Sequence, residues 1–189
     1  MKTVILINGP PRCGKNTLAN FMAERRADAI VMGFSDHLKR CVHHVHLGKD
    51  GWGLNPDAFD SIKDIPQACL GGMSWREAYI DFSEKYIKPR FGKKWFGRQL
   101  LKEALSQPQP LIIIYDSGFV EEVSPLLSCA EIEQISLVHL HRSGTDFSND
   151  SRSYIDLSGA GIQAHKITND GSPYKLWLSS NLLLERILK

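Results

Sequence analysis

The sequence has no long hydrophobic run and few cysteines. None of its apolar stretches approaches the roughly twenty residues that a membrane-spanning helix needs. The apolar run near the N-terminus, Val4 to Ile7, is too short for a secretory signal peptide. The four cysteines are widely scattered and form no Cys-x-x-Cys pair, so neither a disulfide framework nor a zinc pattern is indicated. We therefore expect a cytoplasmic protein with reduced thiols and no membrane partner.

A strong excess of either charge is also absent. The formal net charge is +2, whereas a dedicated nucleic-acid binder normally carries a clear basic excess. A nucleic-acid partner is therefore not expected, while a small anionic ligand remains compatible. Apolar residues at 42% and charged residues at 23% are ordinary globular values. We predict a single domain over residues 1–189, which is long enough to bury a real core.

A glycine-rich stretch, Gly9-Pro10-Pro11-Arg12-Cys13-Gly14-Lys15-Asn16-Thr17, follows a strand pattern and precedes a helical one. This context is typical of a phosphate-binding loop, in which glycines let backbone N–H groups and a helix N-terminus face one anion. Lys15 adds a point charge, and Thr17 can offer its hydroxyl to magnesium. A Gly/Pro-rich turn that ends in Gly-Lys by coincidence is the weaker alternative. Asn16 departs from the usual pattern, which has Ser or Thr directly after the lysine.

Strand-like and helix-like segments alternate along the chain. After residues 4–7, apolar strand patterns occur at 29–34, 111–115, 135–140 and 165–168. Helical patterns lie at 14–26, 37–47, 74–87, 93–106, from about 120, and at the C-terminus. Strands that alternate with helices predict an α/β fold in three layers, with a mainly parallel sheet covered by helices on both faces.

The segment after the second strand is less regular. Glycines predict a loop over 48–56, and the poorly periodic residues 57–72 predict a partly helical, mobile insertion. Order resumes at Ser74, which forms a capping-box signature with Glu77. Because Pro89 disfavours helix at the residue before it, we expect the helix to end there.

Polar residues directly follow each of the later strands. In an open parallel sheet, ligands bind beyond the carboxyl ends of the strands. These ends carry Ser35-Asp36, Asp116, Arg142 and Asn169-Asp170. Asp116 stands where an acidic residue often completes a magnesium site, directly or through water. Capping of the following helix by Asp116 is the alternative.

Several arginines are candidates for contacts with phosphate. Arg142 and Arg152 lie on a polar, turn-rich segment, where a closing loop can place cations over a migrating phosphoryl group. A basic, aromatic-rich stretch over 85–98 can hold a phosphate or stack a base, although a solvated helix face is the ordinary alternative. Because arginine is favoured for bidentate phosphate contacts, the preferred candidates are Arg76, Arg90 and Arg98.

Two further patterns have ordinary explanations. The run His43-His44-x-His46 lacks a carboxylate or cysteine partner at helical spacing, so amphipathic helix positions explain it better than a metal site does. Cys13 lies near a helix N-terminus, which would lower its pKa and make it sensitive to oxidation. The simpler interpretation of Cys13 is a small loop residue.

An ordered set of motifs spans almost the whole chain: Gly9-x4-Gly14-Lys15-x-Thr17, Phe34-Ser35-Asp36-x-Leu38-Lys39, Trp75-Arg76-Glu77, Asp116, His141-Arg142-x-Gly144, and Ile167-Thr168-Asn169-Asp170-Gly171-Ser172. In this set the chain resembles the bacteriophage deoxynucleoside monophosphate kinases, a branch of the P-loop nucleoside monophosphate kinase-like proteins. The displaced threonine after Asn16 fits that group. Relatives often carry Asp where this chain has Asn16, and the T-even phage enzyme is longer.

The resemblance implies a five-stranded parallel sheet of order 2-3-1-4-5, and transfer of the γ-phosphoryl group of ATP, with Mg²⁺, to a deoxynucleoside 5′-monophosphate. Together with the patterns above, it assigns ATP binding to Gly9, Arg12, Cys13, Gly14, Lys15, Asn16, Thr17, Thr168 and Asn169. It assigns magnesium to Thr17 and Asp116, and catalysis to Lys15, Asp116 and Arg142. It assigns acceptor binding to Ser35, Asp36, Lys39, Arg76, Arg90, Arg98 and Arg152.

The same resemblance also bears on organisation and location. It implies an acceptor-binding insertion over about residues 48–98 and a lid-like segment over about 142–158. The expected location is the cytoplasm, that of the host if the protein is phage-encoded. A homodimer is left open.

Two other functions stay open. One is a P-loop kinase for another small acceptor, such as phosphomevalonate, a sugar acid or a coenzyme precursor; the aromatic residues near the basic stretch favour an acceptor that carries a base. The other is a non-catalytic regulator that binds ATP as a structural ligand. Lys15, Thr17, Asp116 and the lid-like arginines argue against a regulator, because a protein that only binds ATP needs no cations over the γ-phosphate.

Overall fold

The computed structural model describes residues 1–24, 26–148 and 150–188. Its centre is a five-stranded parallel sheet of order β2-β3-β1-β4-β5. The strands are β1 (Lys2–Asn8), β2 (Ala29–Met32), β3 (Leu111–Ile114), β4 (Ile132–His141) and β5 (Ala164–Thr168). In the register of the central strands, Val4 lies opposite Ile112 on one side and Ile135 on the other. The predicted α/β architecture and strand order are confirmed.

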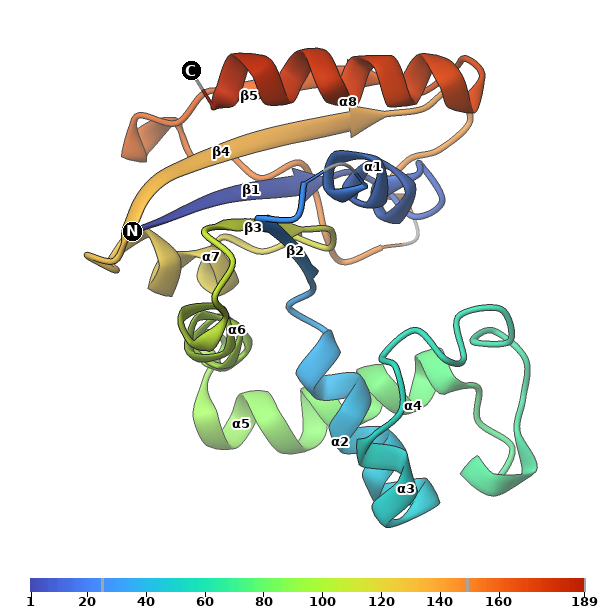
Figure 1. The fold of residues 1–189 in the computed structure, drawn as a ribbon. Helices are drawn as coiled ribbons and strands as arrows, with labels where there is room; N and C mark the ends of the chain where they lie inside the picture. The colour runs from blue at the N-terminus through green and yellow to red at the C-terminus, as the bar shows by residue number, and fades with distance from the viewer. Residues whose placement is uncertain (25, 149, 189) are drawn as a thin grey trace.

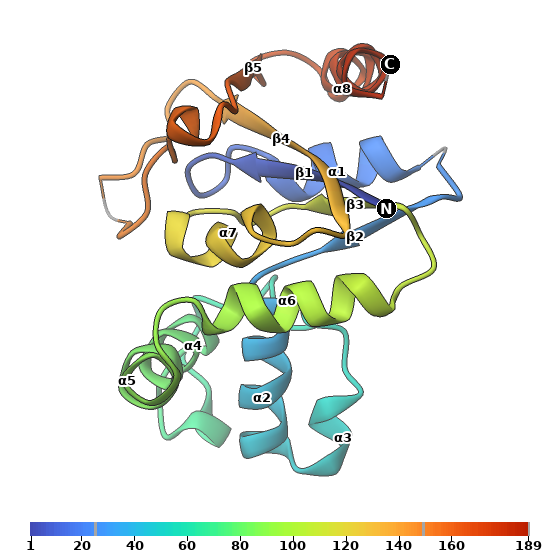
Figure 2. The ribbon, with the colours of Figure 1, turned by 90° about the vertical axis from the view of Figure 1, so that its left-hand side faces the viewer.

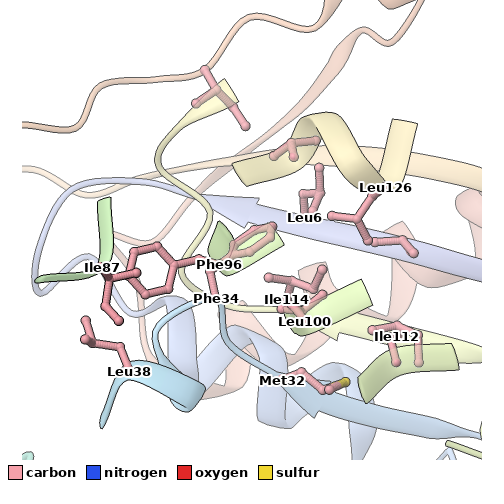
Figure 3. Close-up of a cluster of buried hydrophobic side chains, with 14 of the residues drawn as sticks. Leu6, Met32, Phe34, Leu38, Ile87, Phe96, Leu100, Ile112, Ile114 and Leu126 are labelled. Atoms are coloured by element: carbon pink, nitrogen blue, oxygen red, sulfur yellow. The ribbon is translucent and has the colours of Figure 1, made fainter. Parts of the chain in front are cut away.

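Helices cover both faces of the sheet (Figure 1). They are α1 (Lys15–Ala23), α6 (Trp95–Ser106), α7 (Val120–Leu127) and α8 (Pro173–Ile187). Side chains alternate between the faces of a strand, so Ile5 and Ile7 pack under α1 and α8. Leu6 and Ile112 lie on the opposite face with α6 and α7, in the cluster shown in Figure 3. None of the described helices is long and apolar enough to cross a membrane.

A group of short helices projects from the β2–β3 side of the sheet, away from α8 (Figures 1 and 2). Its elements are α2 (Asp36–Leu47), α3 (Lys49–Trp52), η1 (Ala68–Leu70), α4 (Trp75–Phe82), η2 (Ser83–Ile87) and α5 (Lys88–Phe91). Leu38 and Ile87 from this group share a core cluster with Phe34 and Phe96 (Figure 3). The insertion is therefore anchored to the sheet layer by apolar contacts. A further short turn, η3 (Ser158–Ala160), precedes β5.

The insertion departs from the expected boundaries in two places. The capping box at Ser74 and Glu77 is confirmed, with Ser74 N donating to Glu77 Oε2 at 2.7 Å. However, α3 occupies part of the predicted loop, and the helical run continues past Pro89. The wide π turn of η2 precedes Pro89, which stands in the first turn of α5, where a missing N–H is tolerated.

Helices α6 and α7 approach each other backbone to backbone at Gly97. A Cβ at Gly97 would lie 2.0 Å from the Glu122 carbonyl oxygen and 3.0 Å from Pro125 Cδ. Glycine is required here because any side chain would push the two helices apart.

Gly97→Ala should lower the free energy of unfolding by about 2 kcal/mol, because overpacking against backbone outweighs the gain of roughly 1 kcal/mol in helix propensity. Denaturant-induced unfolding followed by circular dichroism measures this change. Gly53→Ala is the matched control, since its nearest neighbour, the Asp50 carbonyl oxygen, would lie 3.9 Å from the new Cβ. A Gly97→Ala protein as stable as the Gly53→Ala protein would contradict the close helix contact.

Candidate functional site

The loop over residues 9–17 joins β1 to the N-terminus of α1. Gly14 is the N-cap of α1 and has a left-handed backbone, with φ 102°. A Cβ at Gly14 would lie 2.5 Å from Asn169 Nδ2, and one at Gly9 would lie 2.5 Å from the Leu140 carbonyl oxygen. One motif glycine is therefore required by backbone conformation and the other by the close approach of β4.

Lys15 lies within this loop and is only 9% exposed. Its Nζ donates hydrogen bonds to the carbonyl oxygens of Gly9, at 2.8 Å, and Pro10, at 2.7 Å. Burial lowers the pKa of Lys15, and the nearby Arg152 acts in the same direction. A cation held this way needs little rearrangement to meet an anion in the loop.

The other loop residues divide between the interior and solvent. Cys13 is fully buried, and its carbonyl oxygen accepts a hydrogen bond from Asn169 Nδ2 at 2.8 Å. Burial raises the pKa of the Cys13 thiol despite the nearby Lys15, so the alternative of a lowered, oxidation-sensitive thiol is wrong. Asn16 and Thr17 are exposed on the first turn of α1. Thr17 is thus accessible from solvent.

A cavity of about 350 Å³ adjoins the loop on the β4–β5 side. Its lining consists of Pro10, His141, Arg142, Ser143, Thr145, Asp146, Phe147, Tyr154 and Asp170. The Tyr154 and His141 rings pack with centroids 4.5 Å apart. Asp170 fixes the rim by accepting bonds from Ser143 N, at 2.6 Å, and Ser143 Oγ, at 2.7 Å. An aromatic wall with polar edges at this volume suits a small aromatic ligand.

Asp116, at the end of β3, is tied to the loop that follows β2. Its carboxylate accepts hydrogen bonds from Phe34 N at 2.7 Å, Ser35 N at 2.9 Å and Ser35 Oγ at 2.5 Å. The N-cap of α7 is Phe119, so the alternative of helix capping by Asp116 is wrong. Because both Asp116 oxygens are engaged, contact with a magnesium ion through water fits this side chain better than direct ligation.

The predicted acceptor residues on α2 are paired with their neighbours. Asp36 accepts a hydrogen bond from the Tyr115 hydroxyl, and burial raises the pKa of Asp36 to about 7. Lys39 is buried and forms ion pairs with Asp57 and, at 3.6 Å, with Asp60. These contacts fasten α2 to the sheet and to the following loop.

The three arginines predicted on the insertion do not converge. Arg76 pairs with Asp64, with 2.5 Å between Arg76 Nε and Asp64 Oδ1. Arg98 Nη2 donates to the Phe91 carbonyl oxygen at 2.7 Å, and Arg90 is exposed on α5. Of these three, Arg76 is the one that a shared carboxylate links to the P-loop, because Asp64 also lies 3.9 Å from an Arg12 nitrogen.

Arg152 is fixed near the end of β3. Its Nε and Nη2 donate to Asp150 Oδ1 at 2.8 Å and Oδ2 at 2.5 Å, which forms a bidentate pair. Its stem crosses Gly118 so closely that a Cβ there would lie 2.3 Å from Arg152 Cδ. Arg152 is also near enough to Lys15 to lower the pKa of that lysine. A second cation thus accompanies Lys15 beside the loop.

No protein-family model and no curated protein matches this chain. Among solved structures, TT1252 from Thermus thermophilus is similar over 98% of each chain, with a TM-score of 0.50 and 13% identity. A sugar kinase from Janibacter sp. HTCC2649 is similar over 98% of this chain and 95% of its own, with a TM-score of 0.49 and 11% identity. At sequence identities this low, structural similarity is evidence for the fold alone. The fold is an α/β P-loop fold.

In this P-loop fold, Asn8 is a buried residue that the sequence analysis did not single out. Its Nδ2 donates to the carbonyl oxygens of Ser117, at 2.7 Å, and Ser153, at 3.1 Å, and its Oδ1 accepts from Ile155 N at 2.9 Å. Asn8 therefore joins the ends of β1 and β3 to the segment after β4. In the sequence, the signal for this role was the position of a side-chain amide, Asn8, between the apolar run and the first glycine of the loop.

Glu122 is a second residue missed from sequence. It is buried in the first turn of α7, and burial, reinforced by the nearby Asp116, raises its pKa to about 8. Lys88 and Arg152 act in the opposite direction. The adjacent Glu121 is a surface partner of Lys93. Successive glutamates on a helix cannot share a face, which is the signal that one of the pair faces inward.

Glu122→Gln should make the protein more stable at high pH. The Glu122 pKa is raised from 4.5 to about 8 on folding, so its protonation stabilises the fold fully below pH 4.5, and that stabilisation is lost as pH rises towards 8. Glutamine stays neutral, so the variant should gain up to about 5 kcal/mol over the wild type above pH 8 and almost nothing near pH 4.5. Urea unfolding at a series of pH values between 5 and 9 measures the difference. This series covers the range between the unfolded-state pKa of 4.5 and the folded-state pKa of about 8.

The matched control for this experiment is the neighbouring residue. Glu121→Gln removes an exposed carboxylate whose pKa its own backbone holds below the ordinary value. It should not stabilise the protein at high pH. Equal responses of the two variants would show that the Glu122 carboxylate is not specially buried.

Proposed function

We propose that this protein transfers the γ-phosphoryl group of ATP to a deoxynucleoside 5′-monophosphate. The observation that carries the proposal is the position of the P-loop between two different surroundings. On its β4–β5 side lies the cavity with the Tyr154 wall, and on its β2–β3 side lies the insertion that carries Arg76. A donor nucleoside on one side and an acceptor phosphate on the other would bring the reacting groups together over the loop.

The donor side fits ATP in its residue types. The loop N–H groups, the N-terminus of α1 and Lys15 suit the triphosphate, and the wall formed by Tyr154 and His141 suits the base. Thr17 would offer its hydroxyl to the magnesium ion, and Asp116 would reach that ion through water. When bound, magnesium–ATP supplies the phosphoryl group and part of the charge neutralisation.

Phosphoryl transfer mainly requires that the two substrates are positioned and that cations neutralise the phosphate charge. An oxygen of the acceptor phosphate forms the new bond to the γ-phosphorus as the bond to the β–γ bridging oxygen breaks, which yields ADP and the diphosphate. The acceptor phosphate is largely ionised at neutral pH, so no strong general base is needed. In our proposal Lys15 and Arg152 hold the migrating group, and Arg142, exposed beside the donor cavity, moves over it when the substrates bind.

Acceptor-dependent release of ADP tests this function. The panel holds deoxynucleoside and ribonucleoside monophosphates, phosphomevalonate, sugar acids, phosphorylated coenzyme precursors and a blank without acceptor. We expect release with particular deoxynucleotides only. Release with a non-nucleotide acceptor would replace the proposed substrate, and ATP binding without any acceptor-dependent release would indicate a regulator.

A further inference from the structure

Arg12 differs from the other P-loop residues in its backbone and in its reach. Among the described residues it is the one non-glycine with a positive φ, 63°, a conformation that side chains disfavour. Its carbonyl oxygen accepts a hydrogen bond from Arg142 Nη1 at 3.4 Å. Its side chain is 86% exposed, and Nη2 lies 3.9 Å from Asp64 Oδ2 on the insertion. The loop thus directs a cation towards the acceptor side.

Asp64 contacts a second arginine as well. Its carboxylate accepts hydrogen bonds from Arg76 Nε at 2.5 Å and Arg76 Nη2 at 3.5 Å. The backbone N–H of Arg76 donates to the Lys63 carbonyl oxygen at 2.9 Å, which fixes the start of α4 beside Asp64. The bond from Arg76 holds the pKa of Asp64 below its ordinary value, so the carboxylate is ionised at neutral pH. One anion therefore joins guanidinium groups from the P-loop and from α4.

Stability does not explain this arrangement. The Asp64 and Arg76 side chains are 48% and 41% exposed, and ion pairs at such exposure contribute little to folding. The cluster holds two cations and one anion, so it has an unused positive charge. Guanidinium groups bind carboxylates and phosphates through the same paired N–H donors. A phosphate dianion offers similar oxygen geometry and more charge than Asp64.

We propose that Asp64 is a displaceable internal anion at the position that the acceptor's phosphate takes between Arg12 and Arg76. This inference rests on the proposed function, which makes the anion the acceptor's phosphate. Without acceptor, Asp64 partly neutralises the charge of the two arginines and links α4 to the P-loop. A dianionic phosphate replaces Asp64 on both arginines, whereas a monoanion gains little from the exchange. Asp64 is thus a positioning residue that favours dianionic acceptors.

The test removes the Asp64 charge and keeps its shape. Asp64→Asn is compared with the wild type by isothermal titration with inorganic phosphate, without ATP. We expect phosphate to bind about tenfold more tightly, because it no longer competes with the ionised Asp64 carboxylate for Arg12 and Arg76. The gain should shrink as sodium chloride is added, since salt screens exposed charges. Asp81→Asn, which breaks the Asp81–Lys85 pair on α4, is the matched control and should leave phosphate binding unchanged.

A double variant identifies the site of the gain. Adding Arg76→Ala to Asp64→Asn should remove the tenfold increase, whereas phosphate bound at the P-loop itself is common to all variants. Unchanged or weaker phosphate binding by a folded Asp64→Asn protein would show that Asp64 is only a brace and overturn the proposal. The titration needs no turnover. A failed ADP-release panel alongside the tenfold gain would therefore remove the kinase proposal and leave the anion site standing.

Discussion

Lys15→Ala should lower kcat/KM for phosphoryl transfer by about a thousandfold or more. The Lys15 ammonium group is shielded from water and held by the Gly9 and Pro10 carbonyl oxygens, so its charge is little screened where the triphosphate would lie. Alanine leaves the loop amides in place and removes this charge alone. Steady-state ADP release with the best acceptor of the panel measures the loss.

The control for this variant must separate catalysis from folding. Lys102→Ala removes an exposed lysine from α6 and should keep full activity. Lys15→Met keeps the apolar stem and should be as inactive as Lys15→Ala, which excludes a packing defect. Thermal unfolding should show both Lys15 variants folded at the assay temperature. A folded Lys15→Ala protein with turnover within tenfold of the wild type would contradict a catalytic role for Lys15.

The strands and the P-loop were predictable because each carries its own local signal. Val4 to Ile7 and Leu111 to Ile114 are continuously apolar, and all of these residues are buried, as a strand covered on both faces requires. Gly9 and Gly14 mark positions where a Cβ would collide with neighbouring atoms. Such signals need no knowledge of distant residues.

The insertion was less predictable because its order depends on tertiary contacts. Leu38 and Ile87 share a core cluster with Phe34, which precedes α2, and with Phe96 of α6. The helical run continues past Pro89 because a π turn precedes the proline, and sequence spacing does not show such a turn. Local propensity therefore predicted the longer helices, but neither α3 nor the point where the helical run ends.

The site was predicted as a set of charges without their partners. Sequence reasoning placed Asp116 at a strand end, but its bonds to Ser35 join residues 81 positions apart. Spacing likewise gave no means to choose among the insertion's arginines or to find Asp64. For Cys13, the helix N-terminus suggested a lowered pKa, whereas burial dominates and raises it. The hydrogen-bond partners of a side chain and its burial both depend on tertiary packing. The hydrophobic periodicity of a single sequence does not show that packing.

Gly118→Ala should lower kcat by about a hundredfold or more without contacting either substrate in our proposal. The new Cβ would lie 2.3 Å from Arg152 Cδ and 2.7 Å from Cγ. Arg152 would have to move, because these atoms lie in the middle of a side chain whose end is bound to Asp150. The backbone itself accepts alanine, since the φ of Gly118 is outside the left-handed region. ADP release and thermal unfolding, measured together, give the loss and check the fold.

The mechanism of that loss can be isolated with two further variants. Arg152→Ala should match Gly118→Ala, and the double variant should be no worse than either, because both changes remove the same cation from beside Lys15. Gly159→Ala is the matched control, since no atom lies within 4 Å of its added Cβ, and it should keep full activity. Full turnover by Gly118→Ala, or losses that multiply in the double variant, would show that Arg152 does not act from the position it holds here. Non-additive losses would place the second cation of the transfer step on the Gly118 surface, where the absence of a side chain makes room for it.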